Sequence, residues 1–158
     1  MTTRYAAQTT VSVESSRAEI ERTLSRYGAE SFMYGWDKER AVVQFRTSDR
    51  HVRFVLAMPP RDDPEFTRHS RGRRTPEAAE KLWEQACRQR WRALNLVIKA
   101  KLEAVAAGIS EFEDEFLSHI VLPDGSTAGE WLRPQIQKAY ATGEMPTSFL
   151  QLGSGEST

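Results

Sequence analysis

The sequence predicts an α+β fold: a small antiparallel β-meander with an N-terminal helix, a long central basic amphipathic helix and a C-terminal helical segment. Two patterns carry this prediction. Three short segments between residues 30 and 58 alternate in polarity between polar turns. Residues 76–107 then keep an apolar period close to 3.6 without a break. A chain of 158 residues is long enough for one domain with its own core, so residues 1–158 are expected to form a single domain.

The N-terminal region predicts a helix over residues 16–27. Ser16 and Glu19 have the spacing of a capping box, and apolar residues follow at helical intervals up to Gly28, which favours a helix end. The weak alternation of Thr9–Val13 indicates a short strand before this helix. Residues 1–8 and 153–158 have the polar composition of disordered ends.

The meander is predicted to consist of three strands, Glu30–Tyr34, Ala41–Arg46 and His51–Met58. Residues 59–74 follow as a polar loop that ends in a run of arginines. A loop of this length without regular structure suggests mobility or a function. Its basic end reads equally well as an arm that orders on nucleic acid and as a solubilising loop, and we expect a mobile basic loop.

The central helix is predicted to begin after Thr75, with Pro76 in its first turn, and to end before Gly108. Apolar side chains cover about half of its circumference. The opposite side carries a stripe of four cations, with no acidic residue on the same line. We call this set the basic stripe; its members are Lys81, Arg88, Arg92 and Lys99.

Net charge is zero, with 22 basic and 22 acidic residues, yet the charges are segregated along the chain. Residues 1–67 are balanced, residues 68–101 carry a net charge of +7, and residues 102–158 carry −7. The middle block is typical of a surface that contacts phosphates. The predicted nucleic-acid-binding residues are Arg71, Arg73, Arg74, Lys81, Arg88, Arg92 and Lys99.

Other charged and aromatic residues have more than one interpretation. Arg90 and Lys101 lie within the apolar arc, so we expect them to pair with carboxylates of residues 102–158, which we call the acidic block. A phosphate-binding cleft is the alternative interpretation. Trp36 and Tyr34 would stack on bases if exposed, but their types favour the core.

The acidic block supports two interpretations. Ser110 and Glu113 have capping-box spacing, and carboxylates gather at a helix N-terminus for dipole reasons alone. Clustered carboxylates also bind Mg²⁺ in nucleases; the candidates are Glu111, Glu113, Asp114 and Glu115. A last helix is predicted from Thr127 to Tyr140, with Trp131 and Ile136 facing the core together with Tyr140.

Several classes of protein are disfavoured. The sequence has no phosphate-binding glycine loop, no paired-cysteine or HExxH metal motif and no GxSxG elbow, so we assign no catalytic residue, metal or cofactor and favour a protein that is not an enzyme. A single cysteine, Cys87, excludes an internal disulfide and fits a reducing compartment. Without a long apolar run or a signal-peptide core, we expect a cytoplasmic protein and no membrane partner.

Three stretches resemble small proteins encoded by phages and mobile elements, over residues 10–150; they are IERTLSRYGAESFMYGW, AVVQFRTSDRHVRFVLAMP and EAAEKLWEQACRQRWRALNLVIKAKLEAV. The order of a strand meander and a long basic helix also resembles the core of Rad52-like single-strand annealing proteins. That resemblance implies assembly into rings or filaments, with single-stranded DNA held in a basic groove.

The sequence therefore favours a nucleic-acid-binding protein that binds or anneals single-stranded DNA in phage or mobile-element recombination or replication, and that forms a homo-oligomer. Two alternatives stay open. One is a phage-encoded protein-interaction module that inhibits a host defence or replication enzyme. The other is a metal-dependent nuclease that uses the acidic block.

Overall fold

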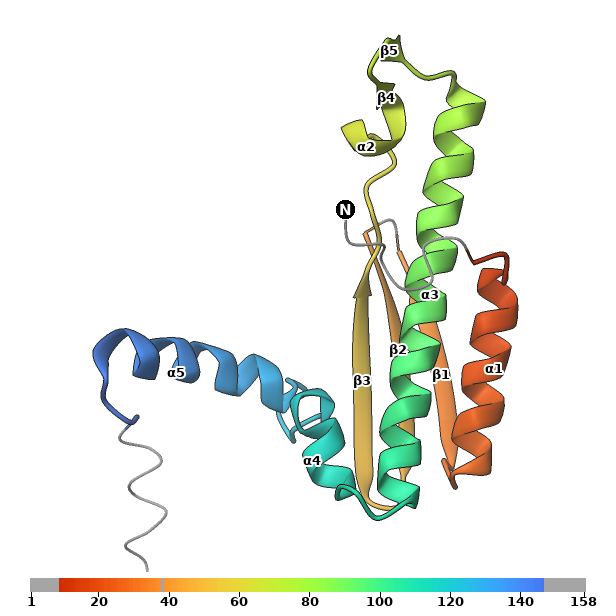
Figure 1. Ribbon diagram of the computed structural model, residues 1–158. Coiled ribbons are helices and arrows are strands. Elements are labelled where there is room, and N and C mark those ends of the chain that lie inside the picture. Colours follow the sequence, from red (N-terminus) through yellow and green to blue (C-terminus); the bar gives the residue numbers. More distant parts are fainter. Residues whose placement is uncertain (1–8, 38, 147–158) are drawn as a thin grey trace, which may run out of the picture.

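A three-stranded antiparallel sheet with helices on one face forms the body of the protein (Figure 1). The computed structural model describes residues 9–37 and 39–146. The strands are β1 (Ser31–Trp36), β2 (Arg40–Thr47) and β3 (Arg50–Ala57), in the order β1-β2-β3. Val43 lies opposite Tyr34 on one side and Phe54 on the other. The predicted α+β meander is confirmed.

The helix α1 (Val13–Arg26) begins earlier than predicted. Ser12 is its N-cap, and the Ser12 hydroxyl accepts a hydrogen bond from the Ser15 amide at 3.0 Å. Thr9–Val13, predicted as a strand, therefore leads into the helix instead, and Ser16, predicted as the cap, is fully buried within it. The predicted end is confirmed, because Gly28 follows the helix with a φ of +87°.

The helix α3 (Pro76–Ala106) is the long central helix that the sequence predicts, capped by the Thr75 hydroxyl at the Ala78 amide. Its apolar side packs on the sheet together with α1. Alternate residues of β2 and β3 face these helices, while Val55 points to the open face of the sheet. The core comprises Ile20, Leu24, Ala41, Val43, Phe45, Val52, Phe54, Trp91, Leu94, Ile98, Leu102 and Phe116.

Residues 59–74 contain regular structure, where the sequence predicts only a loop. Asp63 caps the single turn α2 (Pro64–Thr67) and accepts a hydrogen bond from the Glu65 amide at 2.8 Å. Next come β4 (Arg68–His69) and β5 (Gly72–Arg73), which pair as a hairpin. The reason is local: Asp63-Pro64 starts a helical turn, and Gly72 adopts the φ of +129° that the hairpin requires.

The C-terminal part begins with α4 (Phe112–Phe116) and a 3-10 turn, η1 (Leu117–His119). The predicted Ser110 cap is wrong, since Glu111 is the N-cap and makes no side-chain capping bond. Phe116 is the anchor of this segment: its ring meets the rings of Phe45 and Phe54 edge to face, with centroids 5.8 and 6.3 Å away.

The last helix, α5 (Ala128–Thr142), extends away from the sheet (Figure 1). Thr127 caps it, in agreement with the predicted start of the last helix, and Glu130 completes a capping box. The predicted core face is wrong: Trp131, Ile136 and Tyr140 are 47%, 51% and 89% exposed. The first turn of α5 packs against η1 and is buried. The rest of the helix extends away from the body of the protein (Figure 1).

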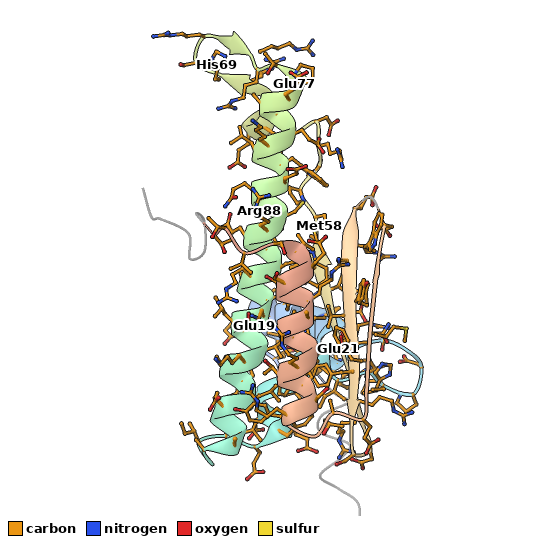
Figure 2. All side chains as sticks on the ribbon, turned by 90° about the vertical axis from the view of Figure 1, so that its right-hand side faces the viewer. Glu19, Glu21, Met58, His69, Glu77 and Arg88 are labelled. Atoms are coloured by element: carbon orange, nitrogen blue, oxygen red, sulfur yellow. The ribbon has the colours of Figure 1, made fainter. Side chains whose placement is uncertain are left out.

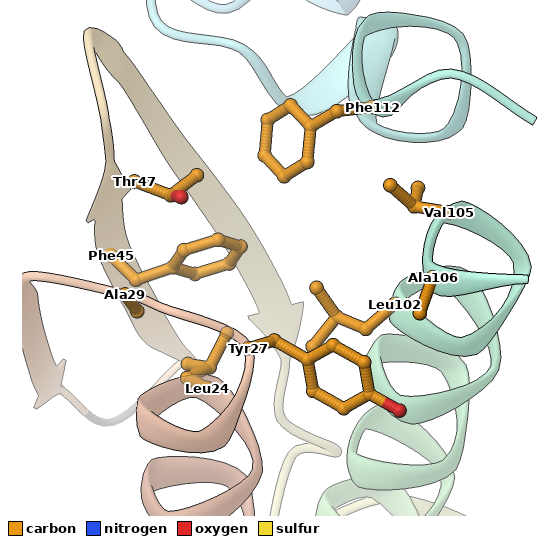
Figure 3. A pocket seen from close by; sticks show the side chains of 9 residues that line it. All are labelled: Leu24, Tyr27, Ala29, Phe45, Thr47, Leu102, Val105, Ala106 and Phe112. Atoms are coloured by element: carbon orange, nitrogen blue, oxygen red, sulfur yellow. The ribbon is translucent and has the colours of Figure 1, made fainter. Parts of the chain in front are cut away.

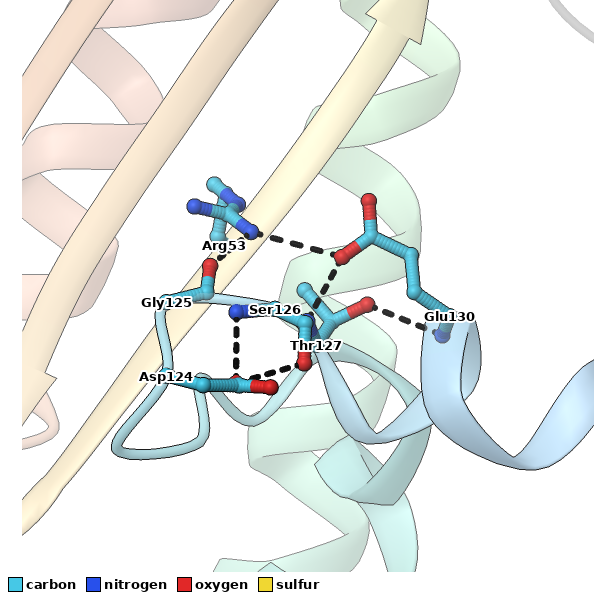
Figure 4. A network of polar contacts seen from close by, with 6 residues as sticks. All are labelled: Arg53, Asp124, Gly125, Ser126, Thr127 and Glu130. Carbon is cyan, nitrogen blue, oxygen red and sulfur yellow. Dashed lines mark hydrogen bonds and ion pairs between the residues drawn. The ribbon is translucent and has the colours of Figure 1, made fainter.

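The beginning of α5 is fixed to β3 by a small polar network (Figure 4). The Arg53 guanidinium donates to the Gly125 carbonyl at 2.7 Å and lies 3.5 Å from the Glu130 carboxylate. That carboxylate also accepts a hydrogen bond from the Thr127 amide at 2.6 Å, which lowers the pKa of Glu130. Arg53 is therefore a structural residue that joins the sheet to α5.

A small apolar cavity of about 220 Å³ lies where α1, β2, α3 and α4 meet (Figure 3). Leu24, Phe45, Leu102 and Phe112 are among its walls. The Tyr27 hydroxyl at its edge is hydrogen-bonded to Glu103, which raises the pKa of that phenol. Because its lining is apolar apart from the Tyr27 and Thr47 hydroxyls, we treat it as a packing feature of the core.

Candidate nucleic-acid interface

The hairpin β4–β5 presents a cluster of exposed cations at one end of the molecule, beyond the end of the sheet (Figure 1). Arg68, Arg71 and Arg73 are exposed and form no ion pair within the described part of the chain. The tip is held by a local hydrogen bond, in which the Arg71 amide donates to Nδ1 of the His69 side chain at 3.0 Å. No acidic residue occurs between residues 68 and 76, so this cluster keeps its positive charge.

Arg74, predicted to contact nucleic acid, is turned inward. Its Nη1 atom donates to the carbonyl oxygens of Glu65 at 3.0 Å and Phe66 at 3.4 Å, and also to that of Arg68. These carbonyls belong to the end of α2 and the start of β4, so Arg74 holds the hairpin onto the turn of helix. Its Nη1 donors are occupied by backbone carbonyls.

The members of the basic stripe differ in whether they are free or bonded within the fold. Lys81 and Lys99 are exposed and make no ion pair among the described residues. Arg88, labelled in Figure 2, donates to the Gln85 side-chain oxygen through Nε at 3.0 Å and Nη2 at 2.7 Å. Its guanidinium also lies 4.0 Å from the Glu84 carboxylate. Arg88 is thus held in contacts within α3.

Arg92, the fourth member, is paired with an acid from another helix. Its Nη1 atom lies 2.6 Å from the Glu19 carboxylate of α1, and both side chains are partly buried. Burial raises the pKa of Glu19, but the neighbouring Asn95 side chain, the hydrogen bond from Arg92 and the charges of Arg92 and Lys99 outweigh it and leave that pKa below its ordinary value. Arg92 is therefore neutralised within the fold.

Arg90 and Lys101 both point inward, but only Lys101 reaches the acidic block. The Lys101 ammonium donates to the Glu115 carbonyl at 2.7 Å and lies 3.4 Å from its carboxylate, as predicted. Arg90 instead donates to the Ala57 carbonyl at 2.8 Å, at the end of β3. The prediction that Arg90 pairs with an acidic-block carboxylate is wrong, because the end of the strand is nearer than α4.

The acidic block does not assemble a metal site among the described residues, where no three His, Cys, Asp or Glu side chains converge in the way that a metal ion requires. Two carboxylates of α4 have cationic partners: Glu115 pairs with Lys101, and Glu113 lies 3.0 Å from the Arg50 guanidinium. The block therefore balances basic side chains of α3 and β3.

The described helices include none with the length and apolar character needed to cross a membrane.

The aromatic residues near the sheet end differ from prediction. Trp36 is 74% exposed and Tyr34 is 46% exposed, although their types favour the core. Both belong to the edge strand β1, and the Arg17 guanidinium lies 4.5 Å from the Tyr34 ring centre. Trp36 also borders a cavity of about 1180 Å³ that sequence reasoning missed. No periodic signal could reveal this cavity, since its walls come from four segments far apart in the chain.

Comparisons with known proteins give no match: no family model, no curated protein and no solved structure is similar to this chain. The resemblances to phage proteins and to Rad52-like annealing proteins thus stay predictions, and the molecule itself has to support any function.

Proposed function

We propose that this protein binds nucleic acid through the arginine hairpin, with single-stranded DNA the favoured form. The observation that carries the proposal is the cluster of Arg68, Arg71 and Arg73, which is exposed, free of ion pairs among the described residues and presented on an ordered hairpin. Lys81, also exposed, continues it onto α3. Guanidinium groups bind phosphate through paired hydrogen bonds, and a convex cationic tip suits a flexible backbone.

The proposal differs from the sequence-based set of residues. Arg74, Arg88 and Arg92 are engaged within the fold, so we assign contact with phosphates to Arg68, Arg71, Arg73 and Lys81, with Lys99 further along α3. The preference for single strands comes from Trp36 and Tyr34, because exposed aromatic rings stack only on bases that are not already paired.

Fluorescence anisotropy of a labelled oligonucleotide tests this proposal. We expect binding at low salt that weakens as salt rises, with a log–log slope of about −0.7 for each neutralised phosphate. The double substitution Arg71→Glu and Arg73→Glu should lower the affinity at least about tenfold and make the slope shallower by about 1.4. The matched control, Arg133→Glu with Lys138→Glu on α5, makes the same change in net charge at another exposed place and should bind as wild type.

An annealing role adds the requirement of assembly. Rings or filaments would appear as a solution mass several times that of the monomer, and oligonucleotide should promote them. A protein that stays monomeric with and without oligonucleotide would be restricted to binding.

A protein-interaction module is the second candidate, favoured by the exposed apolar side chains of Ile136 and Tyr140 on α5. Helices with such faces commonly dock on partner proteins. The substitution Ile136→Ser with Tyr140→Ser should then abolish capture of a host protein that the hairpin variant still captures. Capture that depends on the hairpin instead would favour the nucleic-acid proposal.

A further inference from the structure

The helix α5 is packed only at its beginning. Its first turn is buried against η1, but no residue from Trp131 to Thr142 is buried, and the helix points away from the sheet at a wide angle to the strands (Figure 1). A helix of about 15 residues is only marginally stable in water without tertiary contacts. Pro134 weakens α5 further, because proline cannot donate a backbone hydrogen bond. Within one copy of the chain, α5 therefore lacks the packing that stabilises most helices of its length.

One side of α5 carries an apolar stripe, which we define by Leu132, Ile136 and Tyr140. These residues are four positions apart, so they lie on the same side of the helix. Leu132 is half-buried, whereas Ile136 and Tyr140 are more than half exposed. From Leu132 to Tyr140 the stripe is about 12 Å long. It contains no charged residue, so it is suited to an apolar surface.

A second apolar surface lies on the open face of the sheet, opposite to the helices α1 and α3. Val42 lies between Gly35 on β1 and Val55 on β3, and Met33 is two residues before Gly35 and so on the same face. We call these four residues the open-face patch. Met33 and Val55 are more than half exposed. The arginines at the borders of the patch, on β2 and β3, are paired with carboxylates, so the patch itself is uncharged.

We propose that the open-face patch is covered by α5 of a second copy of this chain, and that two copies exchange these helices about a two-fold axis. The sizes agree, because the stripe of about 12 Å lies across the strands and the axes of β1 and β3 are about 10 Å apart. Since α5 points away from its own sheet, it leaves its own patch uncovered.

A second copy is the partner that supplies both surfaces at once. A two-fold axis repeats the contact, so one interface covers the stripe and the patch of each copy. Burial of apolar surface is the driving force, because neither surface carries a charge. The inference does not rest on the proposed function, since no arginine of the hairpin belongs to either surface. The two also differ in their response to salt, which weakens phosphate contacts and not apolar ones.

Sedimentation equilibrium of the full chain measures the assembly. We expect wild type to have twice the mass of one chain at both low and high salt. Ile136→Ser should raise the dissociation constant at least about tenfold, because the side chain is lost from two equivalent contacts. The matched control is Lys138→Ser, about 200° around α5 from Ile136, which should dimerise as wild type. Circular dichroism checks that both variants are folded.

Disulfide cross-linking identifies the surfaces that meet. Val55→Cys and Ile136→Cys each place one new thiol on an exposed surface, and the native Cys87 is buried. Mixed under mild oxidation, the two variants should form a disulfide-linked pair that neither forms alone. Cross-linking of Ile136→Cys with itself would show that α5 pairs with α5 and would overturn the proposal. A chain that stays monomeric at every concentration would also overturn it, and would leave binding of oligonucleotide through the hairpin unaffected.

Discussion

Arg92 on α3 and Glu19 on α1 form an ion pair, with Nη1 and the carboxylate oxygen 2.6 Å apart. The pair connects the two helices that cover the sheet, next to the fully buried Asn95. It turns the centre of the basic stripe from a candidate phosphate contact into part of the packing between helices. Stability, and not only ligand binding, should therefore respond to changes at this position.

We expect Arg92→Glu to lower the free energy of unfolding by about 1–3 kcal/mol, because it removes the pair and sets two partly buried carboxylates against each other. Urea denaturation measures this change. Lys81→Glu makes the same change of charge on an exposed part of α3 and should alter stability by less than about 0.5 kcal/mol. Equal stability of the two variants would show that the Arg92–Glu19 pair contributes nothing to the helix contact.

Arg74 and its neighbour Arg73 provide a second matched comparison. Arg74 donates to backbone carbonyls of Glu65 and Phe66, whereas Arg73 is exposed. Arg74→Ala should destabilise the hairpin by roughly 1 kcal/mol, since three backbone carbonyls, of which that of Phe66 is part-buried, lose a charged donor. Hydrogen exchange of the Arg74 amide, which donates to the Thr67 carbonyl at 2.8 Å, should accelerate, while Arg73→Ala should leave it unchanged. Similar exchange in both variants would contradict the structural role of Arg74.

The fold was largely predictable because its signals are local. Alternating polarity between polar turns predicted the three strands of the sheet, β1, β2 and β3. Thr75-Pro76 and Gly108 predicted the bounds of α3, with a difference of one residue at its C-terminal end. The start of α1 was not predictable from its best capping pattern, because Ser12, outside that pattern, caps the helix and Ser16 is buried by packing on α3. Tertiary contact thus placed the cap at Ser12, although Ser16 with Glu19 is the stronger capping pattern in the sequence.

The candidate site was less predictable because it depends on distant partners. A helical wheel of α3 shows Arg92 in an unopposed stripe, but Glu19 neutralises it from 73 positions earlier in the chain. The exposed hairpin arginines were found by composition alone. Trp36 was assigned to the core by its type, since nothing in the sequence shows that β1 is an edge strand or that α3 overhangs the sheet.

Gly129 in the first turn of α5 lies against the backbone of η1. A Cβ atom at this position would be 2.6 Å from the Ser118 carbonyl oxygen, which no rotamer change can relieve. Gly129→Ala should therefore lower the free energy of unfolding by about 1–3 kcal/mol or displace α5. Gly35→Ala on the open edge of the sheet meets no atom within 4 Å and should be neutral or slightly stabilising. Thermal unfolding compares the two, and a Gly129→Ala variant as stable as Gly35→Ala would contradict the close packing of α5 on η1.

His119 in η1 should make stability depend on pH in the slightly acidic range. Its ring stacks on Phe54 with centroids 3.9 Å apart, and burial, together with the nearby Lys101 charge, lowers its pKa, although a hydrogen bond to the backbone of Arg53 opposes this. The folded state thus favours the neutral ring, so stability is complete above the unfolded pKa of about 6.5 and declines as pH falls from there towards the lower folded pKa. The pKa of His51 is also lowered, by burial and by Arg46 and Arg53, so it acts in the same direction.

The test is the slope of unfolding free energy against pH in wild type and in His119→Phe, which keeps an aromatic ring on Phe54 but cannot take up a proton. Between about pH 7 and 5.5, above the range in which carboxylates titrate, we expect wild-type stability to fall with pH and the variant to fall less, with His51 responsible for what remains. His51→Gln in addition should make the slope nearly flat. A slope that His119→Phe leaves unchanged would mean that His119 is protonated as readily in the folded protein as in the unfolded chain, and that its stack on Phe54 does not exclude the charged form.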